Sequence, residues 1–282
     1  MTAPSTHMVS LTFDNFGEAF DLQNRDGSEN QTFGAHPSAS VLPEILDHLD
    51  ATELKATFFV EGWNAEHYGP SLMDMARRGH EVSLHGWRHE DWANQTEAGR
   101  HLILEDCVEA FGTLGLTPSG LRPPGGVSTS DTAALLAEFD LSYVSPLGHT
   151  VDVTTNQVSL PFQWTHVDAL YFEPLLAKGR ARLLGRSVLA EISAWDAALE
   201  SLLYARANAA TYRTVVFHPY LLAEKRRMHT FKTFTQRLAE WTQGSCVPCR
   251  VAADHARSNP DWVAELRRTP PAMGSDELLT AF

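Results

Sequence analysis

The hydrophobic and polar positions of the chain follow two alternating patterns. Short runs of apolar and β-branched residues predict β-strands at 9–13, 55–60, 81–84, 120–121, 141–144, 157–162 and 214–217. Between these runs, apolar residues recur every three or four positions and predict amphipathic helices at 40–49, 71–78, 103–114, 131–139, 191–204 and 231–241. Ser38 is a suitable N-cap for the first of these helices, and Gly79 is placed to end the second.

This strand–helix alternation predicts an α/β fold with a parallel sheet and helices outside it. About seven repeats favour a distorted barrel, although the pattern is also compatible with an open, doubly wound sheet. The stretch 148–186 is poorly periodic, and we interpret it as an elaborated loop region over the site. We expect one catalytic domain at 1–266, followed by a weakly structured tail at 267–282.

Several chemically capable residues come directly after a predicted strand. They are Asp14, His85, Arg122 and His218. In a parallel barrel these positions share the rim at the carboxyl ends of the strands, where catalytic groups collect. His89 is four residues beyond His85, so a helical turn would let both imidazoles bind one metal ion. Each residue has an ordinary alternative as a turn cap, a surface side chain or a core histidine, but together they favour an active site.

Four segments, in order along the chain, resemble motifs of the polysaccharide deacetylase family (carbohydrate esterase family 4, with the NodB-homology domain). They are TFDNFG at 12–17, HGWRH at 85–89, RPPGG at 122–126 and VFH at 216–218. The family motifs are T-F-D-D-G, H-[ST]-x-x-H, R-x-P-x-G and L-x-H. A further motif, an Asp near a Trp, is loosely matched by Trp164 and Asp168.

The resemblance implies a (β/α)7-type barrel and a metal-dependent hydrolase of non-peptide carbon–nitrogen bonds, which removes an acyl group from a small or sugar-derived amide. Asp14 would be the general base, and Arg122 would hold its carboxylate. His218 would protonate the leaving amine, and Asp168 would tune His218.

The implied cofactor is a divalent metal ion, most simply zinc, because zinc can polarise a carbonyl and acidify a bound water. His85 and His89 would be two of its ligands, and Asn15 stands where the family has a second Asp. Asn15 would ligate through its amide oxygen, or Asp14 or Glu18 would take the metal instead, or the metal would be weak or absent. The intact His pair favours metal binding.

The second departure from the family motifs is Gly86, where a Ser or Thr is expected. Its loss indicates a local rearrangement that would bring Trp87 near the metal. We expect Trp87, Pro123 and Trp164 to contact the substrate, with Trp63 and Trp92 also shaping an apolar pocket. Two rival functions stay open at this point. One is a hydrolase of cyclic amides such as allantoin, with or without a metal, and the other is a non-catalytic ligand-binding protein.

The charge composition of the chain limits the classes of molecule that it is expected to bind. The formal net charge of −13 disfavours nucleic acid and anionic membranes and leaves small molecules or oligosaccharides. The polar N-terminus and the absence of a long apolar run predict a cytoplasmic protein. The sequence does not determine the oligomeric state, and a homo-oligomer is possible. Cys246 and Cys249 form a single C-x-x-C pair, which we interpret as structural. The sequence contains no Gly-rich phosphate loop and no G-x-S-x-G nucleophile elbow, which disfavours nucleotide-binding enzymes and serine hydrolases.

Overall fold

The strands form one sheet in a computed structural model that describes residues 7–24, 34–155, 157–203 and 210–268. The order across the sheet is β6-β7-β5-β4-β3-β2-β1-β8. The strands are β1 (His7–Asp14), β2 (Thr57–Val60), β3 (Glu81–Leu84), β4 (Gly120–Leu121), β5 (Tyr143–Val144), β6 (Asp152–Val153), β7 (Val158–Ser159) and β8 (Thr211–Phe217).

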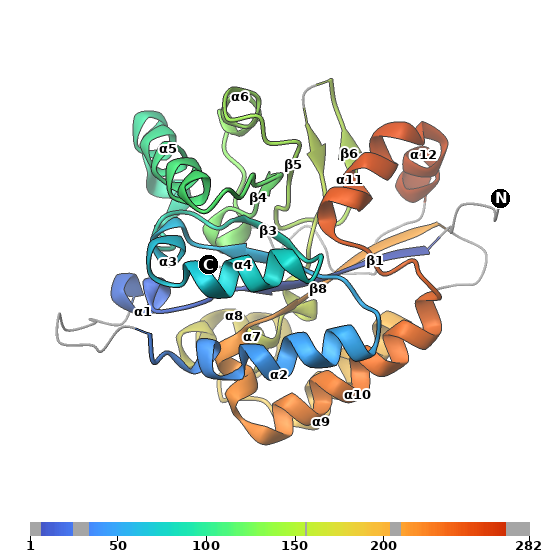
Figure 1. Cartoon of the computed structure of the whole chain (residues 1–282). Helices are drawn as coiled ribbons and strands as arrows, with labels where there is room; N and C mark the ends of the chain where they lie inside the picture. Colours follow the sequence, from blue (N-terminus) through green and yellow to red (C-terminus); the bar gives the residue numbers. More distant parts are fainter. Residues whose placement is uncertain (1–6, 25–33, 156, 204–209, 269–282) are drawn as a thin grey trace.

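Helices pack around this sheet and at its two ends (Figure 1). The longer helices are α2 (Pro37–Ala51), α4 (Gly69–Arg77), α5 (Glu97–Thr113), α8 (Ala177–Leu184), α9 (Ile192–Leu203), α10 (Lys225–Thr242), α11 (Cys249–Ser258) and α12 (Pro260–Arg268). The shorter ones are α1 (Ala19–Asn24), α3 (Gly62–His67), α6 (Thr132–Glu138) and α7 (Asp168–Phe172). In Figure 1, α11 and α12 lie near the start of β1, and α1 lies where β1 ends. None of the helices in the described ranges has the length and apolar character needed to span a bilayer.

Parallel pairing places the functional ends of the strands on one rim. β1 lies between β2 and β8 and is parallel to both. The parallel order continues from β2 through β3, β4 and β5 to β7, and only β6 pairs antiparallel, with β7. The residues that follow β1, β3, β4 and β8 therefore emerge at the same edge of the sheet.

The segment 158–167 crosses the opening between the two edges of the curled sheet. It leaves β7, makes an isolated bridge from Phe162 to Leu147, and makes another from Val167 to Val216 of β8. This crossing segment joins the β5 side of the sheet to β8. The parallel arrangement is thus extended into a distorted barrel by a stretch with little regular strand structure.

Two hydrophobic cores hold the barrel. The larger lies between the sheet and the surrounding helices and includes Phe13, Phe58, Trp92 and Phe217, all at most 1% exposed. The smaller includes Phe59 and Tyr143 together with alanines of α11. Burial of apolar area on this scale is the main stabilising contribution to the fold.

The predicted strands are found in the expected order, with differences at their ends. β7 stops at Ser159, although Leu160 and Phe162 still donate to the carbonyls of Val144 and Pro146, because Pro146 has no amide hydrogen to donate in return. β8 starts at Thr211, three residues before the predicted start. The apolar pattern does not extend to these first residues, because they are partly exposed and mostly polar, so the prediction missed them.

The poorly periodic stretch 148–186 is more ordered than predicted, since it contains β6, β7, α7 and α8. The N-cap prediction for α2 was wrong. His36 caps this helix by accepting from the Ser38 amide, while the Ser38 hydroxyl accepts from the amide of Gly17 at 2.9 Å. Residues 269–282 of the predicted tail lie outside the described residues, and Arg267 and Arg268 belong to the end of α12.

Candidate active site

The rim residues meet around one small pocket of about 40 Å³. Its lining contains most of the residues that the sequence singled out: Asp14, Asn15, His85, His89, Arg122, Pro123, Trp164 and His218. Gly125, Gly126, Phe162 and Val167 complete the lining. The pocket therefore combines charged and polar groups from four strand ends with an apolar wall from the crossing segment.

Arg122 fixes the Asp14 carboxylate from inside the barrel. Its Nη1 donates to Asp14 Oδ1 at 2.6 Å and to Thr12 Oγ1 at 2.9 Å, and its Nη2 donates to Ser145 Oγ at 3.0 Å. The guanidinium carbon lies 4.1 Å from the ring centre of Phe59, and Arg122 is 0% exposed. A buried ion pair with this many bonds holds Asp14 in one orientation. The other carboxylate oxygen, Oδ2, lies 4.0 Å from His85 Nε2.

His218 and Asp168 form a second buried pair at the end of β8. Asp168 Oδ1 lies 2.6 Å from His218 Nδ1, and Asp168 Oδ2 accepts from the His218 backbone amide at 2.9 Å. Burial alone lowers the pKa of His218, but the charge and hydrogen bond of Asp168 outweigh it, so this pKa lies above its ordinary value. Asp168 thereby favours the protonated form of His218, and Nε2 is the ring nitrogen that remains without this contact.

His85 and His89 are held as neutral imidazoles. His85 Nδ1 lies 2.8 Å from the carbonyl oxygen of Arg122 and donates to it, which leaves the lone pair on Nε2. The two rings are 4.9 Å apart at their centres. Burial lowers the pKa of each of them to about 3. Neutral imidazoles, one with its tautomer fixed by a backbone carbonyl, are the usual state of metal-ligating histidines.

Asn15 supplies an unsatisfied oxygen beside these imidazoles. Its Oδ1 is buried and has no hydrogen-bond partner, and its φ of 57° is left-handed, a conformation that Asn tolerates. In the described parts of the chain, His, Cys, Asp and Glu side chains alone make no group of three that could hold a metal ion. Asn15 lines the same pocket as these two neutral imidazoles, and its amide oxygen has no hydrogen-bond partner among the residues that the structure describes. This donor set fits a divalent ion such as zinc.

Besides Asp168, which lies behind His218, four predicted residues are outside the pocket lining. The hydroxyl of Tyr68 donates to the Glu18 carboxylate at 2.6 Å, so Glu18 is already engaged. Trp87 is half-buried and packs against the larger core beside Gly62. Trp63 and Trp92 are buried and also absent from the lining, which leaves Trp164 as the tryptophan in the pocket wall.

Two residues that the sequence analysis missed also follow strands. Ser145 comes after β5 and holds the Arg122 guanidinium. Glu61 comes after β2, is 0% exposed, and accepts from Asn64 Nδ2 at 3.0 Å, while its other oxygen has no partner. Burial raises the pKa of Glu61 well above its ordinary value. Because both residues directly follow strands, the strand-end rule that predicts Asp14 and His218 at the rim applies to them as well.

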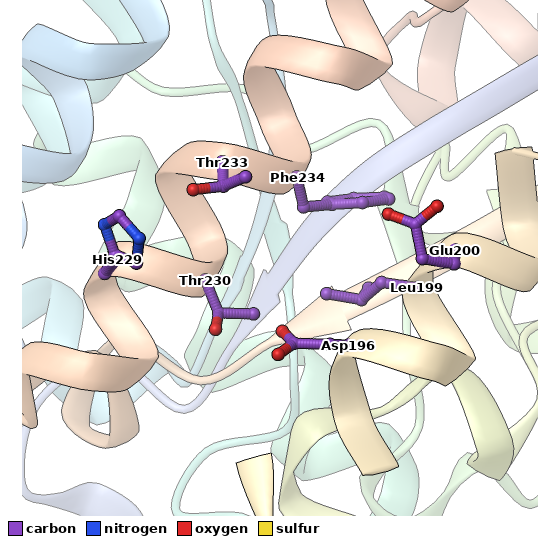
Figure 2. Close-up of a pocket in the computed structure, with 7 residues that line it drawn as sticks. All are labelled: Asp196, Leu199, Glu200, His229, Thr230, Thr233 and Phe234. Atoms are coloured by element: carbon purple, nitrogen blue, oxygen red, sulfur yellow. The ribbon is translucent and has the colours of Figure 1, made fainter. Parts of the chain in front are cut away.

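Other candidate features lie apart from this site. Cys246 and Cys249 are buried free cysteines, and burial raises their thiol pKa values to about 12 and about 11, as expected for unreactive thiols. A groove of about 290 Å³ lies between residues of α9 and α10 (Figure 2). Asp196 and Glu200 of α9 line it opposite His229 and Thr233 of α10, and no rim residue reaches it.

The sequence matches known deacetylases over its N-terminal half. The profile of the polysaccharide deacetylase family matches residues 2–144. The chain is 34% identical over 103 residues to peptidoglycan-N-acetylglucosamine deacetylase PgdA of Listeria monocytogenes, a match that covers 36% of this chain and 22% of that protein. It is 30% identical over 121 residues to the chitooligosaccharide deacetylase of Bradyrhizobium sp., which covers 40% of this chain and 52% of that protein. These matches therefore span about a fifth to a half of the length of the relatives.

Similar folds cover nearly the whole chain. A candidate polysaccharide deacetylase from Mycobacterium smegmatis superposes with a TM-score of 0.77 at 24% identity, covering 99% of this chain and 98% of that one. PuuE allantoinase superposes with a TM-score of 0.69 at 14% identity, covering 92% of each chain. At these identities the likeness concerns the fold, and it confirms the predicted distorted barrel. With its profile match over half its length, this chain belongs to the polysaccharide deacetylase family.

Proposed function

We propose that this chain is a divalent-metal-dependent N-deacetylase that acts on an N-acetylated amino sugar or a similar small amide. The observation that carries the proposal is the convergence of two buried pairs, Asp14–Arg122 and Asp168–His218, on one pocket that also contains His85 and His89. A base and an acid are thereby held on one pocket before substrate binds. The names of the matched relatives, which act on peptidoglycan and chitooligosaccharides, support an amino-sugar substrate.

In this proposal the two pairs divide the proton transfers of amide hydrolysis. Asp14, held by Arg122, accepts a proton from the attacking water. His218, kept protonated by Asp168, donates a proton to the amide nitrogen as the carbon–nitrogen bond breaks. Without that proton the nitrogen would leave as an unstable anion, so the acid is as necessary as the base. Acetate and a free amine are the products.

His85, His89 and Asn15 would hold the metal ion. When bound, the ion supplies Lewis acidity, which polarises the amide carbonyl and lowers the pKa of water. The chain's own contribution is to keep both imidazoles neutral and to leave Asn15 Oδ1 without a competing partner.

The size of the pocket supports a short acyl group. A volume of about 40 Å³ accommodates only a few water-sized positions, and Phe162 and Trp164 contribute apolar surface to it. An acetyl methyl fits such a space, whereas a long acyl chain does not. The sugar or amine portion would then extend out of the pocket.

The test is an assay of acetate release by the zinc-loaded chain from N-acetylglucosamine and its tetramer, with allantoin in the same panel. We expect acetate release that stops on chelation and falls by about 10³-fold or more in Asp14→Asn, because removal of a general base costs 10²–10⁴-fold. Asp196→Asn, an exposed change on α9, is the matched control and should keep full activity. Turnover of allantoin that survives chelation, or no turnover of any amide, would contradict the proposal.

A further inference from the structure

The loop that carries the two histidines has an unusual backbone. Gly86 has φ 78° and His89 has φ 63°, so two positions of a five-residue loop are left-handed. A non-glycine residue rarely adopts this conformation, and it persists only where surrounding contacts enforce it. The direction of the His89 side chain therefore depends on whatever holds the peptide groups just before it.

Glu90 holds those peptide groups. Its side chain turns back along the loop, so that Oε2 accepts from the Trp87 amide at 3.0 Å and Oε1 accepts from the Arg88 amide at 2.7 Å. Among the described residues, no other acceptor is recorded for either amide. A carboxylate that receives two successive amides forms charge-assisted bonds, which are stronger than neutral ones.

The carbonyl side of the same loop is tied down separately. Gly62 donates from its amide to the Gly86 carbonyl at 2.9 Å, and Trp63 donates to the Trp87 carbonyl at 3.1 Å. The start of α3 therefore fixes the carbonyls, and Glu90 alone fixes the amides. Removal of Glu90 would free one side of the loop while leaving the other side attached.

The Glu90 carboxylate occupies the space that a side chain at position 86 would need. A Cβ atom placed on Gly86 would lie 2.9 Å from Glu90 Oε2 and 3.0 Å from Pro124 Cγ. The hydroxyl residue of the H-[ST]-x-x-H motif and the Glu90 carboxylate are thus mutually exclusive in this backbone. The absence of a side chain at position 86 is what allows Glu90 to reach the amides.

We propose that Glu90 is a positioning residue that orients His89 for metal binding and replaces the hydroxyl side chain missing at Gly86. This inference rests on the proposed function, because it takes His85 and His89 as ligands. It adds a residue outside the pocket lining on which the ligand geometry depends. Glu90 touches neither substrate nor metal in this proposal and acts only through the loop.

The first measurement uses the metal-free protein and follows hydrogen exchange at the Trp87 and Arg88 amides. We expect faster exchange at both amides in Glu90→Ala. In Glu90→Gln we expect faster exchange at one amide, since an amide side chain keeps only one acceptor oxygen. Unchanged exchange in Glu90→Ala would overturn the proposal without reference to any metal.

The second measurement is a calorimetric zinc titration of the whole chain. We expect Glu90→Ala to weaken zinc binding by about 10- to 100-fold, the usual cost of losing a group that orients a ligand. Asp91→Asn is the matched control, because it removes a charge one residue away and its carboxylate bonds the side chain of Asn94 instead of the loop amides. It should change the zinc Kd by less than about threefold. Equal losses in Glu90→Ala and Asp91→Asn would show a simple charge effect and overturn the proposal.

The third measurement is a double-variant cycle with Gly86→Ser. In the otherwise unchanged protein this substitution should weaken zinc binding, because the new side chain meets Glu90. In the Glu90→Ala background it should cost less, since the contact with Glu90 is gone and only the contact with Pro124 and the strain of the left-handed backbone remain. Additive losses would overturn the proposal. If Glu90→Ala fails to fold, Glu90→Gln in the same exchange and titration measurements still decides the question. If the unchanged protein binds no zinc, the proposed function fails while the exchange measurement still tests the loop.

Discussion

The two sides of the pocket differ in how complete they are. On the proton-transfer side, Asp14 and His218 each have a buried partner at 2.6 Å. On the metal side, Asn15 Oδ1 has no partner, and the backbone is left-handed at Asn15, Gly86 and His89. Asp14 and His218 are thus held by contacts within the protein, whereas the Asn15 amide oxygen has no partner among the described residues. If the proposed function holds, the groups that transfer protons are preorganised and a bound metal ion completes the other side.

The largest expected effect is on the proton-transfer side, in His218→Asn. The variant should lower kcat/KM for acetate release by about 10³-fold, because the leaving nitrogen loses its proton donor. Zinc affinity, measured by titration, should stay within about threefold, since His218 is not among the proposed ligands. A variant that also lost zinc would mean that the two sides are not separate.

The next largest effect is expected in Asp168→Asn, which removes the charge and keeps only one of the two acceptor oxygens that face His218. Asp168 raises the pKa of His218, so its loss should lower that pKa. The acid form disappears as pH rises through this pKa, and the alkaline limb of the kcat/KM profile should therefore move to lower pH. We expect a loss of about 10²-fold near neutral pH. A profile with an unmoved alkaline limb would argue against His218 as the acid.

Asn15→Asp tests the metal side of the pocket and should strengthen zinc binding. A carboxylate is a stronger ligand than a neutral amide, so the zinc Kd should fall at least about tenfold, equivalent to about 1.4 kcal/mol. Asp tolerates the left-handed φ of 57°, so the backbone should be retained. Calorimetric titration measures the change. Unchanged or weaker zinc binding would place the third ligand elsewhere.

The last prediction concerns the stability of the metal-free protein, not its activity or zinc affinity. The pKa values of His85 and His89 are lowered to about 3 in the folded state, against about 6.5 when unfolded. Below pH 6.5 the unfolded chain takes up protons that the folded chain does not, so stability falls as pH drops toward 3. Between pH 7 and pH 5 this amounts to about 2 kcal/mol for His85, which is buried, and to less for His89, which is partly exposed.

Urea unfolding at several pH values measures this dependence. His89→Gln should flatten the slope of stability against pH. The matched control is His101→Gln, which removes a partly exposed histidine that does not line the pocket. Equal slopes for the unchanged protein and His89→Gln would show that His89 is not held neutral.

Much of the fold could be predicted because its strands are short, apolar and regularly spaced. The placement of Asp14, His85, Arg122 and His218 on one rim followed from parallel topology alone. The register of β6 and the position of α7 could not be predicted, because the stretch around them has no clear period. Their places depend on long-range bridges such as that from Val167 to Val216.

The site was harder to predict at positions where the backbone conformation determines which way a side chain points. Trp87 was expected at the substrate, but it packs against the core, in a loop whose left-handed Gly86 and whose contact with Glu90 cannot be read from residue types. Its role in substrate binding stays a prediction. The pairing of Asp168 with His218 could be anticipated only by resemblance, since 50 positions separate them along the chain.

The crossing segment links the shape of the pocket wall to the position of the carboxylate that pairs with His218. Phe162 and Trp164 form part of the pocket wall, Val167 joins β8, and the very next residue is the carboxylate that charges His218. A single short stretch of backbone thus sets both the width of the cavity and the strength of the acid. Insertions or deletions that reshape the cavity through this stretch would also detune the acid. New substrate preferences should therefore arise more readily from exchanges of its side chains than from changes in its length.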